Sequence, residues 1–146
     1  MAHMRTQIRQ ALVAALTGLP ATGARVFVNS VYELRASDLP CLLVQTGDEP
    51  QIDAMVVAGT AQQRQHLVMV KAVAKQASGL QDALDQMLLE VEGALALSTL
   101  GGLVKRMELK AIATTDSAAL DTPVGELTAT WFVTYLTPTT NPDTHL

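Results

Sequence analysis

The sequence predicts an α+β domain in which two helices pack on one face of a single, mostly antiparallel or mixed sheet of about four to six strands. Two segments place apolar residues at steps of three and four, which is typical of amphipathic helices. Other segments alternate apolar and polar residues or form short apolar runs, which is typical of strands. The elements follow the order α-β-β-(β)-β-α-β-β, and antiparallel pairing of the middle strands leads to the α+β class.

The first helix is predicted within "TQIRQALVAALTGL", with Thr6 as its N-cap and with Gly18 and Pro20 at its end. Its apolar stripe consists of Ile8, Ala11, Leu12, Ala15, Leu16 and Leu19. After a glycine-containing turn, a strand is expected from about Arg25 to Asn29.

The middle of the chain predicts two further strands and a projection between them. Pro40 opens the apolar strand "CLLVQT", a composition expected where both faces of a strand are covered. Gly47 to Thr60 is expected to form a projecting loop or hairpin, in which Met55 to Ala58 is a short strand or the tip. "QQRQHLVMVKAVAKQ" is the longest strand candidate. One of its faces holds His66, Val68, Val70, Ala72 and Ala74.

The second helix is predicted within "SGLQDALDQMLLEVEGALAL", where Ser78 and Gln81 match a capping box and Gly101-Gly102 stops the helix. Its core stripe consists of Leu80, Leu84, Met87, Leu88, Val91 and Leu95. Two closing strands follow, "KRMELKAIATTD" and "GELTATWFVTYLT", joined by a long exposed arm. One face of the first holds Met107, Leu109, Ala111 and Ala113, and one face of the second holds Leu127, Ala129, Trp131, Val133 and Tyr135.

Composition limits the possible functions. A chain of 146 residues makes one domain, which we place at 4–137, with 1–3 as a cloning remnant and 138–146 as a flexible C-terminal tail. The net charge of −4 disfavours binding to nucleic acid through phosphate contacts. A single cysteine excludes an internal disulfide framework and a cysteine-based zinc site. The chain shows neither a membrane-spanning apolar run nor a signal peptide pattern, and a cytosolic location is the simplest interpretation.

The residues with reactive side chains form no catalytic motif. Cys41 follows a proline at the start of an apolar strand without a recognisable base, so it is expected to be a small buried hydrophobe. His66 has no second ligand at the spacing of a metal motif and is expected to be structural. The acidic cluster Asp48, Glu49 and Asp53 does not match a calcium loop. We therefore predict no catalytic, cofactor-binding or metal-binding residue, and no enzyme activity.

The last strand leaves two alternatives open. Its second face carries threonines together with Phe132 and Leu136, and Tyr135 lies near the same end. Apolar groups among threonines can mark a surface for a partner, or they can be covered by the first helix.

Taken together, these segments resemble the tail terminator proteins of long-tailed phages, often called minor tail protein U. The resemblance covers about Met4 to Thr137 and depends on packing patterns in a shared order: "MRTQIRQALVAALTGLPATGARVF", "DLPCLLVQTGDE", "GLQDALDQMLLEVEGAL", "MELKAIATT" and "VGELTATWFVTYLT". The chain departs from the family pattern after the first strand. There "SVYEL" replaces the expected basic residue and Pro-Leu-like pair.

The resemblance implies a structural protein that forms a ring, typically a hexamer, on the completed tail tube. Such a ring ends tube polymerisation and binds the head-completion protein; it uses no cofactor and acts in the host cytoplasm and then in the virion tail. An acidic ring around the DNA path would not grip DNA. The interface residues predicted from charge are Asp48, Glu49, Asp53, Arg25, Arg64, Lys105 and Arg106. The alternatives are a head–tail connector or neck protein, an oligomeric ligand-binding domain or small enzyme, and a bacterial domain unrelated to phages.

Overall fold

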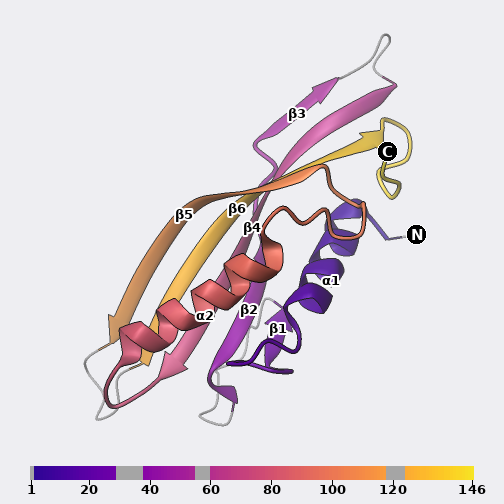
Figure 1. The fold of residues 1–146 in the computed structure, drawn as a ribbon. Coiled ribbons are helices and arrows are strands. Elements are labelled where there is room, and N and C mark those ends of the chain that lie inside the picture. Colours follow the sequence, from indigo (N-terminus) through magenta and orange to yellow (C-terminus); the bar gives the residue numbers. More distant parts are fainter. Residues whose placement is uncertain (1, 29–37, 55–59, 118–123) are drawn as a thin grey trace.

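Two helices lie on one face of a twisted six-stranded sheet (Figure 1). The computed structural model describes residues 2–28, 38–54, 60–117 and 124–146. The helices are α1 (Met4–Leu16) and α2 (Leu80–Leu95), and the strands are β1 (Val26–Val28), β2 (Cys41–Thr46), β3 (Gln51–Ala54), β4 (Ala61–Lys75), β5 (Arg106–Ser117) and β6 (Val124–Pro138). The predicted α+β class is confirmed, and the sheet is mixed because β1 runs parallel to β2 while the other pairs are antiparallel.

The central ladder of the sheet joins β4 to β6 along their whole lengths, from the pair Ala61–Pro138 to the pair Lys75–Val124. The strand order is β1-β2-β4-β6-β5, and β3 also pairs with β4. β2 occupies the inner part of β4, from Val68 to Val73, whereas β3 pairs with the outer part, from Gln62 to Gln65. β4 therefore pairs with β3 in its outer part and with β2 in its inner part, and the partner changes near the middle of β4.

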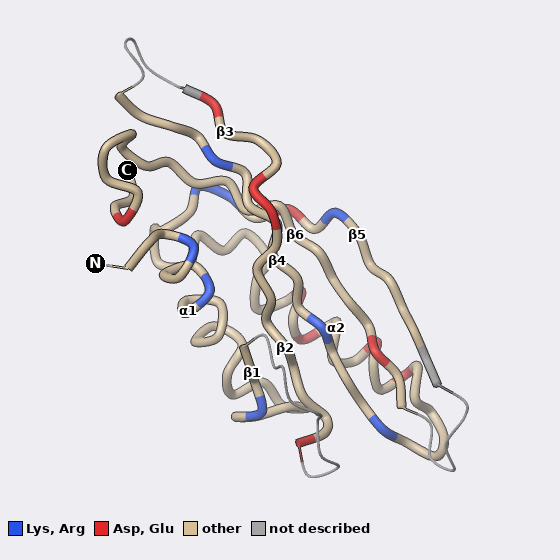
Figure 2. Tube along the Cα trace, turned by 180° about the vertical axis from the view of Figure 1, so that it is seen from behind, with Lys and Arg blue, Asp and Glu red and all other residues tan. Residues whose placement is uncertain are grey.

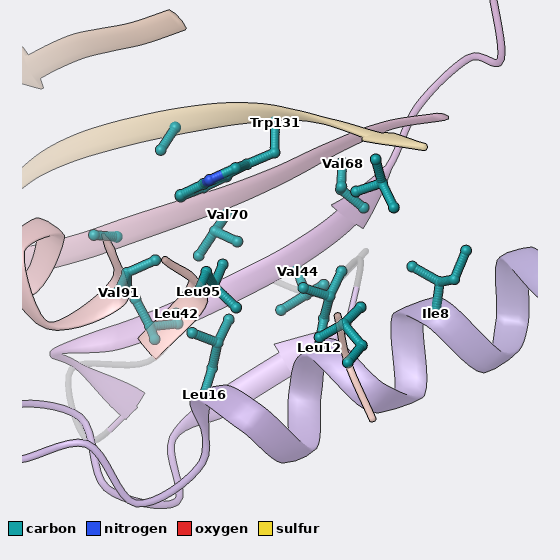
Figure 3. Packing of buried hydrophobic residues seen from close by; sticks show 14 of the residues in the cluster. Ile8, Leu12, Leu16, Leu42, Val44, Val68, Val70, Val91, Leu95 and Trp131 are labelled. Carbon is teal, nitrogen blue, oxygen red and sulfur yellow. The ribbon is translucent and has the colours of Figure 1, made fainter. Parts of the chain in front are cut away.

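The core lies between the two helices and the inner part of the sheet. The predicted apolar stripes are largely confirmed. α1 buries Met4, Ile8, Leu12 and Leu16; α2 buries Leu84, Met87, Val91 and Leu95; and β6 buries Leu127, Ala129, Trp131, Val133 and Tyr135. Figure 3 shows Leu12 and Leu16 of α1 pointing toward Val44 and Leu42 of β2.

Both predicted N-caps are wrong. α1 begins two residues before Thr6 and is capped by His3, whose Nδ1 accepts the Arg5 N–H at 3.1 Å. α2 begins after Gly79, which has a left-handed φ of 68° and no side-chain cap, so Ser78 lies outside the capping position. α2 also ends at Leu95, before the glycine pair that was expected to stop it.

A β-bulge in β5 overturns the predicted alternation of that strand beyond Leu109. Leu109 pairs with Trp131, but the register shifts at the next step, so that Ala111 and not Lys110 pairs with Thr130. A one-residue shift moves every later side chain to the other face. Ala111 consequently joins the face opposite the helices, and Ile112 lies across from Ala129 while remaining 48% exposed.

Phe132 and Leu136 lie on the face opposite the helices, so α1 does not cover them. Tyr135 belongs instead to the core face and is fully buried. Among the described residues this opposite face carries only a small cluster at its inner end, formed by Cys41, Leu43 and Val73 with Phe27, Leu39 and Val124. The expected packing role of Cys41 is confirmed. We call the part of this face formed by Leu67, Met69 and Phe132 the open sheet face.

Other predictions fall partly or wholly outside the described residues. These are the end of the first strand at Asn29, the "SVYEL" departure, Met55 to Ala58 and most of the arm between β5 and β6. The segment 138–146 makes hydrogen bonds to its surroundings: the Pro142 carbonyl accepts the Met4 N–H at 3.0 Å, and the Gln7 side chain donates to the Asp143 carbonyl at 2.7 Å. Its flexibility in solution stays a prediction.

Two neighbouring residues of β6 test this one-sided packing. Trp131→Ala removes a buried ring from the core and is expected to lower the free energy of unfolding by about 3–5 kcal/mol. Phe132→Ala, on the open sheet face, is expected to cost about 1 kcal/mol, because its ring is only half-buried. Urea unfolding measures both values. Equal losses would contradict a sheet whose core lies on one face.

Candidate functional site

A hairpin extends beyond the ends of both helices (Figure 1). It consists of β3 and the outer part of β4, Ala61–Gln65, and its predicted projection is confirmed for these described strands. A 15-residue strand spans about 50 Å, whereas a 16-residue helix spans about 24 Å. The outer end of the sheet therefore lacks the helical cover of the inner end and requires other contacts to hold it.

A buried carboxylate supplies those contacts at the base of the hairpin. Glu49 lies between β2 and β3, and its side chain is only 6% exposed. Its Oε1 accepts the Tyr135 hydroxyl, and its Oε2 accepts Nη1 of Arg64 at 3.3 Å. Arg64 and Tyr135 are direct cross-strand partners in the β4–β6 ladder. Three separate segments thus meet at one carboxylate.

His66 completes this group, which we call the Glu49 cluster: Glu49, Arg64, His66 and Tyr135. The His66 side chain is fully buried, with Nδ1 3.7 Å from Oε1 of Glu49. Among the described residues, neither ring nitrogen has a hydrogen-bond partner. Burial, together with the charge of Arg5, lowers the pKa of His66 to about 4 against the opposing effect of Glu49, so the imidazole is neutral at pH 7.

Tyr135 acts in the cluster as a donor. Burial raises the pKa of Tyr135, and the hydrogen bond to Glu49 raises it further, so the phenol keeps its proton at physiological pH. The Tyr135 phenol and the Arg64 guanidinium both donate to the Glu49 carboxylate, which is a charge-assisted arrangement. Such an arrangement fixes the positions of the three side chains relative to one another.

Helix α1 holds the other side of the hairpin base. Arg5 donates from Nη2 to the Gly47 carbonyl at 2.6 Å, and Arg9 donates from Nη1 to the Thr46 hydroxyl at 3.2 Å. The chain is thus tied to α1 just before Glu49 turns into the cluster. The direction of the hairpin is set from two sides, by α1 and by the β4–β6 ladder.

The predicted interface residues do not form one patch. Glu49 and Arg64 pair within the chain, and Arg25 donates to the backbone carbonyls of Pro40 at 2.8 Å and Ala21 at 3.3 Å. Asp48 and Asp53 are exposed on or beside the hairpin. The exposed residues Lys105 and Arg106 lie at the start of β5, where Arg106 pairs with Glu108 at 2.7 Å.

Sequence reasoning missed the cluster as a unit. It assigned Tyr135 to an apolar stripe and treated His66 as an isolated structural residue. The available signal was the polar residues Arg64 and His66 at successive inward positions of β4, because inward polar groups require partners.

Cys41 is buried in the apolar cluster on the face opposite the helices. Burial raises the pKa of the Cys41 thiol to about 11, with Asp38 adding to the effect, so the thiol keeps its proton at pH 7. Within the described part of the chain, no group of three or more His, Cys, Asp or Glu residues could hold a metal ion. No helix among the described residues combines the length and apolar character needed to cross a membrane.

Comparison with known proteins identifies a shared fold. No protein-family model matches the chain, and no curated protein matches it. Among solved structures, a chain from the virion of a native gene transfer agent particle is similar, with a TM-score of 0.50 and 20% sequence identity. The similarity covers 90% of this chain and 92% of that chain. At this identity the likeness shows a common fold over nearly the whole of both chains.

Glu49→Gln removes the charge that pairs with the largely buried Arg64. We expect the free energy of unfolding to fall by about 3–5 kcal/mol, because a buried ion loses its counter-ion. The matched control is Asp48→Asn at the exposed neighbouring position, with an expected change within about 0.5 kcal/mol. Chemical denaturation compares the two variants, and equal effects would contradict the role given to Glu49.

The low pKa of His66 predicts a loss of stability in mild acid. The unfolded chain binds a proton near pH 6.5, whereas the folded chain does so only near pH 4. Stability contributed by the neutral imidazole is therefore lost as pH falls from 6.5 to 4, by about 3 kcal/mol in total. His66→Gln should remove this part of the pH dependence, which thermal unfolding across the same range measures. An unchanged slope in the variant would contradict the assignment.

Proposed function

We propose that the chain is a structural virion protein that forms a ring, of about six subunits, on the end of a phage tail tube. The ring ends tube polymerisation and provides the surface for head–tail joining. Its partners are other copies of the chain, the tail tube protein and a head-completion protein. It acts in the host cytoplasm during assembly and then in the virion tail, without catalysis and without a cofactor.

The observation that carries the proposal is the shared fold with a chain of the gene transfer agent virion, over nearly the full length of both. The ordered resemblance to tail terminators, from the opening helix to the closing strand pair, supports the more specific role. The shared fold supports the role of a head–tail connector equally well. Affinity for tail tubes, and not for the portal, separates the two roles.

Contacts within the site distinguish the charged side chains that are bound inside the subunit from those that are exposed to a neighbouring subunit. Glu49 and Arg64 hold the hairpin within its own subunit, and Arg25 holds the backbone near β1. Asp48 and Asp53 remain exposed on a hairpin whose base is fixed, and the described residues give them no salt bridge. A projection with a fixed base and exposed carboxylates suits contact with a neighbouring subunit or with the tube.

Light scattering on a sizing column, with and without Mg²⁺ and with tail tubes added, tests this role. We expect a closed ring, either in free solution or on the tube ends, and tubes that stop growing once it is bound. Asp48→Lys combined with Asp53→Lys should weaken ring or tube binding by about tenfold or more, because a partner surface that attracts carboxylates repels lysines. Gln10→Lys on α1 is the control. A monomer that does not bind tail tubes would contradict the proposal. Binding to the portal, and not to tail tubes, would assign the chain to the neck.

A further inference from the structure

The second half of β5 is an exposed edge of the sheet. Among the described residues, β5 pairs only with β6, so no strand lies along its other side. Residues 111–115 of β5 are all exposed and uncharged, and Figure 2 shows them within the tan stretch at the border of the sheet. Proteins commonly protect such an edge with charges, prolines or bulges. In β5 the bulge and the charged residues Arg106, Glu108 and Lys110 come before this stretch, so the stretch itself can accept another strand.

The hairpin has a second edge of this kind. β3 pairs with β4 on one side and, within the described part of the chain, with no strand on the other. Its residues Gln51, Ile52 and Asp53 are exposed. β3 and β5 lie at opposite borders of the sheet, because β4 and β6 separate them. Two different edges of one chain can pair head to tail between copies, since each has backbone N–H and C=O groups available for hydrogen bonds.

Both edges carry an exposed isoleucine on the same side of the sheet. Ile52 pairs with Arg64, which lies with its partner Tyr135 on the helix side, and Ile112 pairs with the buried Ala129 on that side. Each isoleucine is 48% exposed. Rotation about a ring axis carries the helix side of one subunit onto the helix side of the next. In a joined sheet the two isoleucines therefore lie on one face, where each covers the other.

Helix α2 leaves room for a side chain beside this part of β5. The helix packs closely on β6, where a Cβ added at Gly125 would lie 2.9 Å from Cδ1 of Leu84. Between the start of α2 and β5 a cavity of about 150 Å³ remains, lined in part by Leu80, Leu84 and Thr114. A strand added along β5 would place alternate side chains next to this cavity, which is how added strands are positioned in known complexes.

The two edges lie at different heights along the sheet. β3 pairs with residues 62–65 of β4, which pair with residues 134–137 of β6. Residues 111–115 of β5 pair with residues 126–130 of β6. A sheet that closes around an axis needs such a stagger, because its strands are tilted to the axis. The offset between the two edges is thus compatible with a closed ring.

We propose that β3 of one subunit adds to the sheet of the next subunit along residues 111–115 of β5. This inference rests on the proposed ring and names the strands that join its subunits. Backbone hydrogen bonds give the contact its strength, and the contact between Ile52 and Ile112 sets its position. The two edges differ, so the contact is heterologous and can close into a ring.

Crosslinking tests the contact directly. The variant is Ile52→Cys with Ile112→Cys, treated with a short bis-maleimide that reaches across direct and diagonal cross-strand pairs. In rings, in solution or on tail tubes, we expect covalent products larger than a dimer, because each subunit meets two neighbours. Ile52→Cys with Leu89→Cys is the matched control and should give none, since Leu89 is exposed on α2 away from both edges. The natural Cys41 is buried and does not compete.

A pair of charged substitutions tests the same contact by association. Ile112→Lys alone and Ile52→Glu alone should each weaken association by at least about tenfold, because each places a charge against an isoleucine. A chain that carries both should recover association, since opposite charges then lie on neighbouring strands. Leu89→Lys makes the same change at another exposed apolar position and should assemble normally.

The outcomes separate this inference from the proposed function. Rings that give no crosslink, or only a crosslinked dimer, would overturn the strand pairing and leave the proposed function intact. Single charged variants that assemble normally, or a double variant that assembles no better than they do, would also overturn it. The cysteine pair introduces no charge, so it decides the question if a charged variant fails to fold. If the unaltered chain forms no ring, even on tail tubes, the proposed function itself fails.

Discussion

The ladder between β4 and β6 imposes the constraint on which the rest of the structure depends, because it is about twice as long as either helix that lies on it. Its inner part is stabilised by apolar burial against α1 and α2. Its outer part carries β3 and leads into the hairpin, beyond the helices. A sheet end that extends beyond the helices needs other contacts to hold one orientation. The Glu49 cluster and the two arginines of α1 provide them.

The Glu49 cluster fixes the position of the hairpin base through polar contacts and not through apolar packing. A buried ion pair adds little net stability over a well-packed apolar alternative, but losing one partner is costly. Glu49 thus couples the segment before β3 to both strands of the ladder, through Arg64 and Tyr135. His66 lies beside the carboxylate in its neutral form, which limits the positive charge buried there. The result is a projecting hairpin whose base is held by α1 and by the β4–β6 ladder.

Much of the fold could be predicted from the sequence, because apolar periodicity reports which side of an element faces the core. The stripes of both helices, the strand Cys41–Thr46 and the inward face of β6 follow this rule. The caps and the β5 alternation could not be predicted, because one left-handed glycine and one bulge shift the chain by a residue without changing its composition.

The site was less accessible to sequence reasoning. Glu49 and Arg64 were recognised as charged residues, but their pairing within the chain depends on the register that places Arg64 opposite Tyr135. Local patterns do not encode that register. The sequence allows two alternatives for Phe132 and Leu136, a surface for a partner or cover by α1. The choice between them requires knowing on which face of the sheet α1 packs.

Cryo-electron microscopy tests the proposed ring on particles whose copy of this chain carries a small C-terminal tag that a gold-labelled binder can mark. We expect one ring of label at the head-proximal end of the tail tube, with none along its length. Label at the portal would assign the chain to the neck, and label along the tube or absent from the particle would contradict the role of a ring that ends the tube.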